Sequence, residues 1–113
     1  MTLVKYILLL PLNYNDGSEV PQAVTDRICN EIMKIAQGYT LAGTVTGAYR
    51  MKDGSTQIDR STEVWIGIEA SKEKEFKRLV GIFAYRLRQE ALYLECCGST
   101  IEYITPLLPE NLP

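Results

Sequence analysis

The stretch YTLAGTVTGAYRMKDGSTQIDRSTEVWIGIE, residues 39–69, decides the fold of this chain. Two alternating runs flank the pair Asp53-Gly54, and Asp-Gly favours a tight turn because both turn residues adopt positive φ. The pattern therefore predicts a long β-hairpin with Asp53 and Gly54 as its turn. The register that follows places glycines and a tyrosine of the first run opposite residues of the second: Gly43 with Val64, Gly47 with Arg60, and Tyr49 with Ile58.

The two faces of this predicted hairpin differ in character, because side chains alternate between faces along a strand. One face carries most of the large apolar side chains and, toward the turn, a tyrosine and an arginine: Tyr39, Leu41, Val64, Ile66, Ile68, Tyr49 and Arg60. The other face is small and polar apart from one tryptophan: Thr44, Thr46, Asp59, Glu63 and Trp65. We expect helices to cover the first face and to leave Trp65 on the second.

Length and composition indicate one globular domain with a core of its own. The chain has 113 residues, of which 46% are hydrophobic, and a net charge of −2. A net negative charge does not provide the excess of basic residues that binds nucleic-acid phosphates, so nucleic-acid binding is disfavoured. The chain has no histidine, which removes the commonest general base and metal ligand, and we expect no metal and no cofactor. Three cysteines, two of them adjacent, are typical of a reduced, cytoplasmic protein.

An apolar run at the start of the chain, residues 4–10, predicts a central strand that ends at Pro11. It is too short to span a membrane and lacks the small-residue cleavage site of a signal peptide. We therefore expect no membrane association.

Two helices are predicted, one before the hairpin in the sequence and one after it. The first begins with Ser18 as its capping residue and ends at Gly38, with Val20, Val24, Ile28, Ile32 and Ile35 on its buried side. The second begins with Ser71 as its cap and has acidic residues in its first turn, Glu73 and Glu75. Its buried stripe comprises Phe76, Leu79, Val80, Phe83 and Leu87.

The remaining elements complete a recognisable order. Residues 91–97 predict another strand, Gly98-Ser99 a turn, and residues 100–104 a short extra C-terminal strand. Strand, helix, strand, strand, helix, strand is the order of the ferredoxin-like βαββαβ sandwich, an α+β fold with two helices on one face of an antiparallel sheet. We expect one domain over residues 1–105 and a loose tail over 106–113.

Arg60 is the first candidate for binding chemistry. The predicted register places its cation opposite Gly47, where no side chain blocks a ligand carboxylate or phosphate. The alternative is that Arg60 pairs with Glu90 or extends to solvent at the sheet edge. Tyr49, Gln89 and Glu90 are predicted to lie near it and complete a site for a small anionic ligand. The alternative for Tyr49 is a solvated turn, which is the more common role of such residues at a hairpin tip.

Trp65 is the candidate for an assembly surface. A monomer would leave it in water, whereas a sheet-to-sheet dimer or a trimer would bury it together with Thr44 and Thr46. The alternative is that a tail residue such as Leu107 or Leu108 covers it.

Several short motifs resemble a family of small bacterial proteins of unknown function: Gly38-Tyr39-Thr40-Leu41, Gly47-Ala48-Tyr49, Asp53-Gly54, Arg60-Ser61-Thr62-Glu63, and Tyr85 with Arg86, Leu87, Arg88, Gln89 and Glu90. Tyr49 stands where that family has tryptophan. The layout is also similar, more distantly, to P-II-type and CutA-type trimeric proteins, which place a long hairpin between two helices. These resemblances imply the ferredoxin-like fold and assembly through sheets, and they imply no activity.

Three functions are compatible with these observations. The first is a homo-oligomeric binding or regulatory module for a small anionic ligand. The second is a small enzyme of the dimeric α+β-barrel type, with Glu63 or Glu90 as the acid/base and a pocket near Trp65. The third is a structural or interaction protein that recruits a partner strand at an exposed sheet edge.

Overall fold

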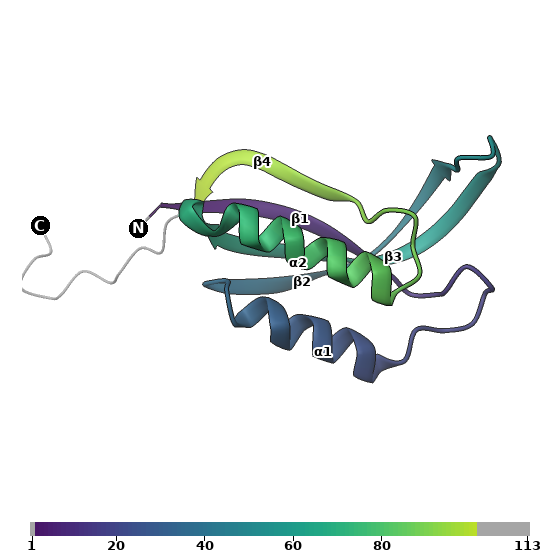
Figure 1. Ribbon diagram of the computed structural model, residues 1–113, viewed down its shortest axis with the longest axis horizontal. Coiled ribbons are helices and arrows are strands. Elements are labelled where there is room, and N and C mark those ends of the chain that lie inside the picture. The colour runs from purple at the N-terminus through teal and green to yellow at the C-terminus, as the bar shows by residue number, and fades with distance from the viewer. Residues whose placement is uncertain (1, 102–113) are drawn as a thin grey trace, which may run out of the picture.

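The computed structural model describes residues 2–101, which form a four-stranded sheet and two α-helices (Figure 1). Along the chain the elements are β1 (Leu3–Pro11), α1 (Gln22–Met33), β2 (Gly38–Arg50), β3 (Thr56–Glu69), a turn of 3-10 helix (Ala70–Lys72), α2 (Glu73–Arg86) and β4 (Leu94–Ile101). The strand order is β2-β3-β1-β4, and all neighbours are antiparallel. Both helices lie on one face of the sheet, which confirms the expected α+β class and ferredoxin-like strand order.

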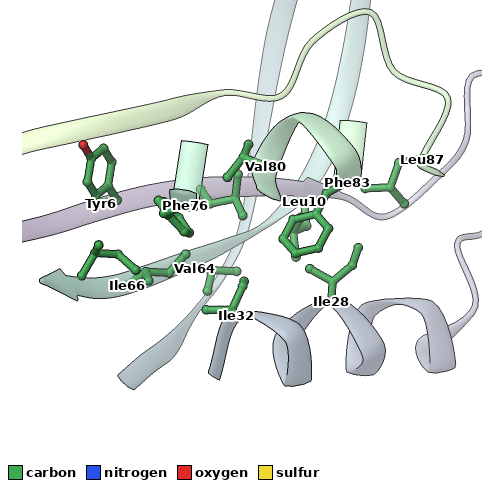
Figure 2. Close-up of a cluster of buried hydrophobic side chains, with 12 residues drawn as sticks. Tyr6, Leu10, Ile28, Ile32, Val64, Ile66, Phe76, Val80, Phe83 and Leu87 are labelled. Carbon is green, nitrogen blue, oxygen red and sulfur yellow. The ribbon is translucent and has the colours of Figure 1, made fainter. Parts of the chain in front are cut away.

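The hydrophobic core lies between the sheet and the helices (Figure 2). Tyr6, Leu8 and Leu10 alternate along β1 and face the helices, each exposing at most 2% of its surface. The helices contribute the stripes that the sequence predicts, with these residues buried: Ile28, Ile32, Phe76, Val80, Phe83 and Leu87. Each such side chain contributes about 1.5–3 kcal/mol when it leaves water, so these residues hold the helices on the sheet. The opposite side of the sheet is called the open face below.

Neither helix begins with the predicted serine cap. The Ser18 backbone N–H and hydroxyl both donate to the Asp16 carboxylate, at 2.9 and 2.5 Å, and α1 starts only after Pro21. The Val20 N–H donates to the Leu12 carbonyl at 2.9 Å and Glu19 forms a β-bridge with Asn13, so these residues are bound to the end of β1 and the helix begins later. Ser71 lies inside the 3-10 turn that precedes α2. The acidic first turn of α2 is confirmed.

The hairpin turn lies where Asp53-Gly54 predicts it, but the predicted register is wrong by one residue near the turn and by two residues at Leu41, which pairs with Val64. The loop has three residues, Lys52, Asp53 and Gly54, with Gly54 at φ +87° and its N–H donating to the Met51 carbonyl at 3.0 Å. The pairs nearest the turn are therefore Arg50 with Thr56 and Tyr49 with Gln57. Further along, Arg60 pairs with Thr46 and not with Gly47.

A β-bulge interrupts β2 at Ala42-Gly43. Leu41 pairs with Val64 and Thr44 pairs with Thr62, so two residues of β2 lie opposite Glu63 alone. Gly43 adopts φ +110°, which glycine tolerates because it has no Cβ. Because of the extra residue, side chains of β2 beyond the bulge lie on the opposite face from the one that strict alternation would give them. Residues 44–62 are called the hairpin arm below. The part of the hairpin near its turn extends beyond the part of the sheet that the helices cover (Figure 1).

The predicted turn at Gly98-Ser99 is wrong, because β4 continues from residue 94 to residue 101. The register with β1 shifts between Val4 and Tyr6, and Gly98 adopts φ +65° at this irregularity. A glycine in the left-handed region bends the strand without taking it out of the sheet. The rest of the expected extra strand, the expected boundary at residue 105 and the tail 106–113 lie outside the described residues.

Candidate ligand pocket

A pocket of about 280 Å³ lies on the open face where the hairpin arm meets the loop that follows α2. This loop, residues 87–93, is called the post-helix loop. The residues that line the pocket come from β1, the arm and the post-helix loop: Leu9, Pro11, Tyr49, Arg50, Met51, Asp59, Ser61, Gln89, Glu90, Ala91, Leu92 and Tyr93. The pocket is thus built from three segments that are distant in the sequence.

The arm presents one side to this pocket and the other to solvent. On the pocket side the residues are buried or half-buried: Val45, Gly47, Tyr49, Gln57, Asp59 and Ser61. On the other side Thr46, Ala48, Ile58 and Arg60 are exposed. Tyr49 lies against Gly47, where a Cβ would overlap the phenol, so the missing side chain of Gly47 makes room for the ring. Ser61 exposes only 6% of its surface and pairs with Pro11.

Two hydrogen bonds orient polar groups at the pocket. The Gln57 amide donates to the Asp59 carboxylate at 2.7 Å, and the Tyr93 hydroxyl donates to the Glu95 carboxylate at 2.7 Å. The bond to Glu95 and the negative charge of that carboxylate raise the pKa of Tyr93, with a smaller contribution from Tyr49. Tyr93 is therefore a neutral phenol at physiological pH, and it lines the pocket.

The post-helix loop is positioned by the end of α2. The Gln89 N–H donates to the Ala84 carbonyl at 3.0 Å and the Arg88 N–H to the Tyr85 carbonyl at 3.1 Å, which is the Schellman pattern. Arg88 holds φ +56° at the position that glycine usually occupies. At the other end of the loop the Tyr93 carbonyl accepts from the Leu9 N–H at 3.1 Å. Both ends of the loop are thus fixed by backbone hydrogen bonds.

The structure brings together three of the four predicted ligand-binding residues. Tyr49, Gln89 and Glu90 line the pocket. Arg60 does not, because the register places it on the solvent side of the arm, paired with Thr46. Arg50 is the cation among the residues that line the pocket.

The predicted interface residues are separated by the bulge. Trp65 pairs with Thr40 on the open face and exposes 39% of its surface, with the Lys5 ammonium 4.0 Å from the ring centroid. Thr44 and Thr46 lie beyond the bulge and face the side that Arg60 faces. The enzyme hypothesis predicts a pocket lined by Trp65, Thr44, Thr46, Glu63 and Asp59. These residues lie on two different faces of the sheet, so they do not line one pocket.

Several lining residues were not predicted from the sequence, namely Leu9, Pro11, Ser61, Leu92 and Tyr93. For Leu9, Pro11 and Ser61 the sequence signal is alternation along β1 and β3, which becomes informative once the pairing of those strands is known. Leu92 and Tyr93 lie in the post-helix loop, where alternation gives no signal. Among residues 2–101 no group of three or more potential metal ligands is found. Over the same residues, neither helix is long and apolar enough to cross a membrane.

The strand order, the two helices on one face and the long hairpin define the class as a ferredoxin-like α+β protein. No known protein family and no curated protein matches the sequence. Among solved structures, a phage SAM lyase in complex with S-methyl-5'-thioadenosine is similar, with a TM-score of 0.59 and 17% identity, over 89% of this chain and 85% of that chain.

Two further solved structures share the fold. CutA1 from Oryza sativa has a TM-score of 0.59 and 13% identity over 93% of this chain and 84% of that chain. A DUF3240 family protein from Shewanella baltica OS155 has a TM-score of 0.53 and 14% identity over 96% of this chain and 98% of that chain. The expected resemblance to CutA-type proteins and to a small family of unassigned function is thereby confirmed at the level of the fold.

Proposed function

We propose that this chain is a cytoplasmic, homo-oligomeric module that binds a small molecule in the open-face pocket. The observation that carries the proposal is that β1, the hairpin arm and the post-helix loop converge there and bring Tyr49, Gln89 and Glu90 together. An apolar floor with a few convergent polar groups is the usual composition of a ligand site.

The lining residues favour a planar ligand that donates hydrogen bonds. Tyr49 and Tyr93 offer two aromatic surfaces above an apolar floor of Leu9 and Pro11. The polar groups at the pocket are mostly acceptors, including the carboxylates of Asp59 and Glu90 and the Gln89 carbonyl. An anionic substituent, if the ligand has one, belongs near Arg50, since Arg60 is on the other side of the arm. A nucleoside-like heterocycle meets these requirements.

The phage SAM lyase supplies a suitable first probe. It shares the fold of this chain and its structure contains S-methyl-5'-thioadenosine, a planar purine with ribose hydroxyl donors. At 17% identity the likeness concerns the fold, so the ligand class rests on the pocket residues and the probe is chosen by analogy.

Titration calorimetry with S-methyl-5'-thioadenosine, adenosine and adenine tests the proposal. Tyr49→Ala is expected to weaken binding by about tenfold or more, because stacking of a base on an aromatic ring contributes roughly 1–3 kcal/mol. Arg60→Ala is the matched control, since it removes a large side chain from the solvent side of the same arm. Absence of binding by the wild type, or equal losses in both variants, would refute this pocket as the site for such a ligand.

The homo-oligomer, a dimer or trimer, is proposed to form through the open face around Trp65. An exposed tryptophan next to Ile7 on a sheet face is typical of a surface that assembly covers. Resemblance to CutA-type proteins supports assembly through sheets. In native mass spectrometry Trp65→Glu should yield monomers, whereas Ile58→Glu, which charges an exposed residue on the other side of the arm, should leave the assembly intact. A monomeric wild type would contradict this part of the proposal.

A further inference from the structure

Asn15, which lies outside the pocket in the loop between β1 and α1, contacts two of the segments that form it. The Asn15 side-chain carbonyl accepts from the Gln57 amide at 3.2 Å and from the Gln89 amide at 3.3 Å. The Asn15 side-chain nitrogen donates to the Arg88 carbonyl at 3.2 Å. One amide side chain thus connects the hairpin arm with the post-helix loop.

The side-chain amides of Asn15, Gln57 and Gln89 have enough donors and acceptors to make all of these hydrogen bonds at once. A side-chain carbonyl has two lone pairs and an amide NH₂ has two hydrogens. Asn15 uses both lone pairs, while the Gln57 nitrogen also donates to Asp59 at 2.7 Å and the Gln89 nitrogen also donates to the Leu87 carbonyl at 3.1 Å. The network therefore runs without a gap from Asn15 to Asp59, a carboxylate at the pocket.

The contact with Arg88 falls at a strained position. A residue other than glycine keeps a positive φ only when the surrounding contacts hold it there. The Schellman hydrogen bonds and the Asn15 bond to the Arg88 carbonyl are such contacts. The path of the chain into Gln89 and Glu90, two pocket residues, depends on that backbone conformation.

We propose that Asn15 is the positioning residue of the open-face pocket and sets both the spacing of its two walls and the orientation of Asp59. The inference rests on the proposed function, because it names the residue that prepares that pocket for its ligand. The Gln57 amide, held by its bond to Asn15, donates to one carboxylate oxygen of Asp59. The other carboxylate oxygen of Asp59 is left to accept a hydrogen bond from a ligand. A ligand with an N–H or O–H group at this point is therefore preferred over one with only acceptors.

Hydrogen exchange on the unliganded protein tests the first half of the inference. Asn15→Ala should speed exchange about three- to tenfold both in residues 87–93 and in residues 56–59, because each exposed hydrogen bond contributes modestly. Asn13→Ala is the matched control. Asn13 lies in the same loop and its side chain donates locally, to the Gly17 carbonyl at 3.1 Å, so its loss should leave both segments unchanged. Faster exchange confined to the loop itself would overturn the inference.

Calorimetry with S-methyl-5'-thioadenosine tests the second half. Asn15→Ala should weaken binding roughly three- to tenfold, and Asn15→Asp, which keeps both acceptor contacts and loses only the donor, should recover part of that loss. Unchanged affinity in Asn15→Ala despite faster exchange would overturn the positioning role. If the wild type binds no nucleoside, the proposed function fails, while the exchange result still decides whether Asn15 connects the two walls.

Discussion

The Tyr6 hydroxyl donates a hydrogen bond of 2.5 Å to the Glu73 carboxylate and so joins β1 to the first turn of α2. Tyr6 is almost fully buried, and its ring packs against Phe76 with 5.3 Å between centroids. Burial, followed by the hydrogen bond and the charge of Glu73, raises the pKa of Tyr6 well above its ordinary value of 10.

Tyr6→Phe should lower the free energy of unfolding by about 1–2 kcal/mol near neutral pH, because the Glu73 carboxylate loses the hydroxyl that donates to it. It should also alter the alkaline limb of the stability profile. The folded pKa of Tyr6 is above the unfolded one, so above about pH 10 the unfolded chain ionises first and stability falls by about 1.4 kcal/mol per pH unit. Below pH 10 this contribution is fully present.

Urea unfolding between pH 7 and 11 checks this prediction. The difference between wild type and Tyr6→Phe should shrink as pH rises above 10, since only the wild type loses this contribution. Tyr85→Phe serves as the control because Tyr85 exposes 86% of its surface. A constant difference across the range would show that Tyr6 does not couple folding to pH.

Gly43→Ala should destabilise the protein by about 1–3 kcal/mol, because alanine at φ +110° is strained whatever space surrounds it. Gly81→Ala provides the opposite case. Gly81 is inside α2 with no atom near an added Cβ, so alanine there should stabilise by about 0.5–1 kcal/mol. Thermal unfolding of both variants decides whether the bulge requires glycine, and equal effects in the two would speak against it.

Gly47→Ala should affect ligand binding more than stability. The added Cβ meets the end of the Tyr49 side chain, which is free to turn away, so the cost to folding is small. The displaced phenol no longer lies over the arm, and affinity for S-methyl-5'-thioadenosine should fall several-fold. Ala48→Ser, one residue along on the solvent side, should leave affinity unchanged. A loss of affinity in Ala48→Ser as large as in Gly47→Ala would point to a general effect on the arm.

Arg88→Gly should stabilise the protein by about 0.5–1 kcal/mol, since glycine adopts the left-handed conformation at the end of α2 without strain. Arg88→Ala separates this effect from loss of the guanidinium, because alanine keeps the Cβ and gains nothing. Denaturant midpoints measure the difference. If Arg88→Ala stabilised as much as Arg88→Gly, backbone strain would not be its cause.

Much of the fold follows from local patterns in the sequence. The Asp53-Gly54 pair places the turn, and helical spacing of residues such as Ile28 and Phe83 identifies the buried sides of both helices. The register was missed because an Asp-Gly pair serves a two-residue loop and a three-residue loop equally well. The bulge at Gly43 was missed because a glycine in a strand has several uses, and only its φ distinguishes them.

The candidate site was predictable where its residues lie on the hairpin or at the end of α2. Tyr49, Gln89 and Glu90 were identified from their polarity and position. Ser61 and Tyr93 required knowledge of how β1 pairs with β3 and of the path of the post-helix loop, which are tertiary properties. Arg60 keeps the face that alternation along β3 predicts, but the shifted register moves Tyr49 of β2 to the opposite face and so separates the two residues.

The bulge at Ala42-Gly43 also bears on how this chain tolerates changes in length. The pairs on its two sides, Leu41 with Val64 and Thr44 with Thr62, differ in register by one residue of β2. Deletion of Gly43 would therefore preserve every other pair along the hairpin and leave each side chain on its present face. A one-residue deletion in β3 at Glu63 would instead increase the mismatch. A one-residue deletion at residues 42–43, or a one-residue insertion beside Glu63, should accordingly be better tolerated than the reverse changes.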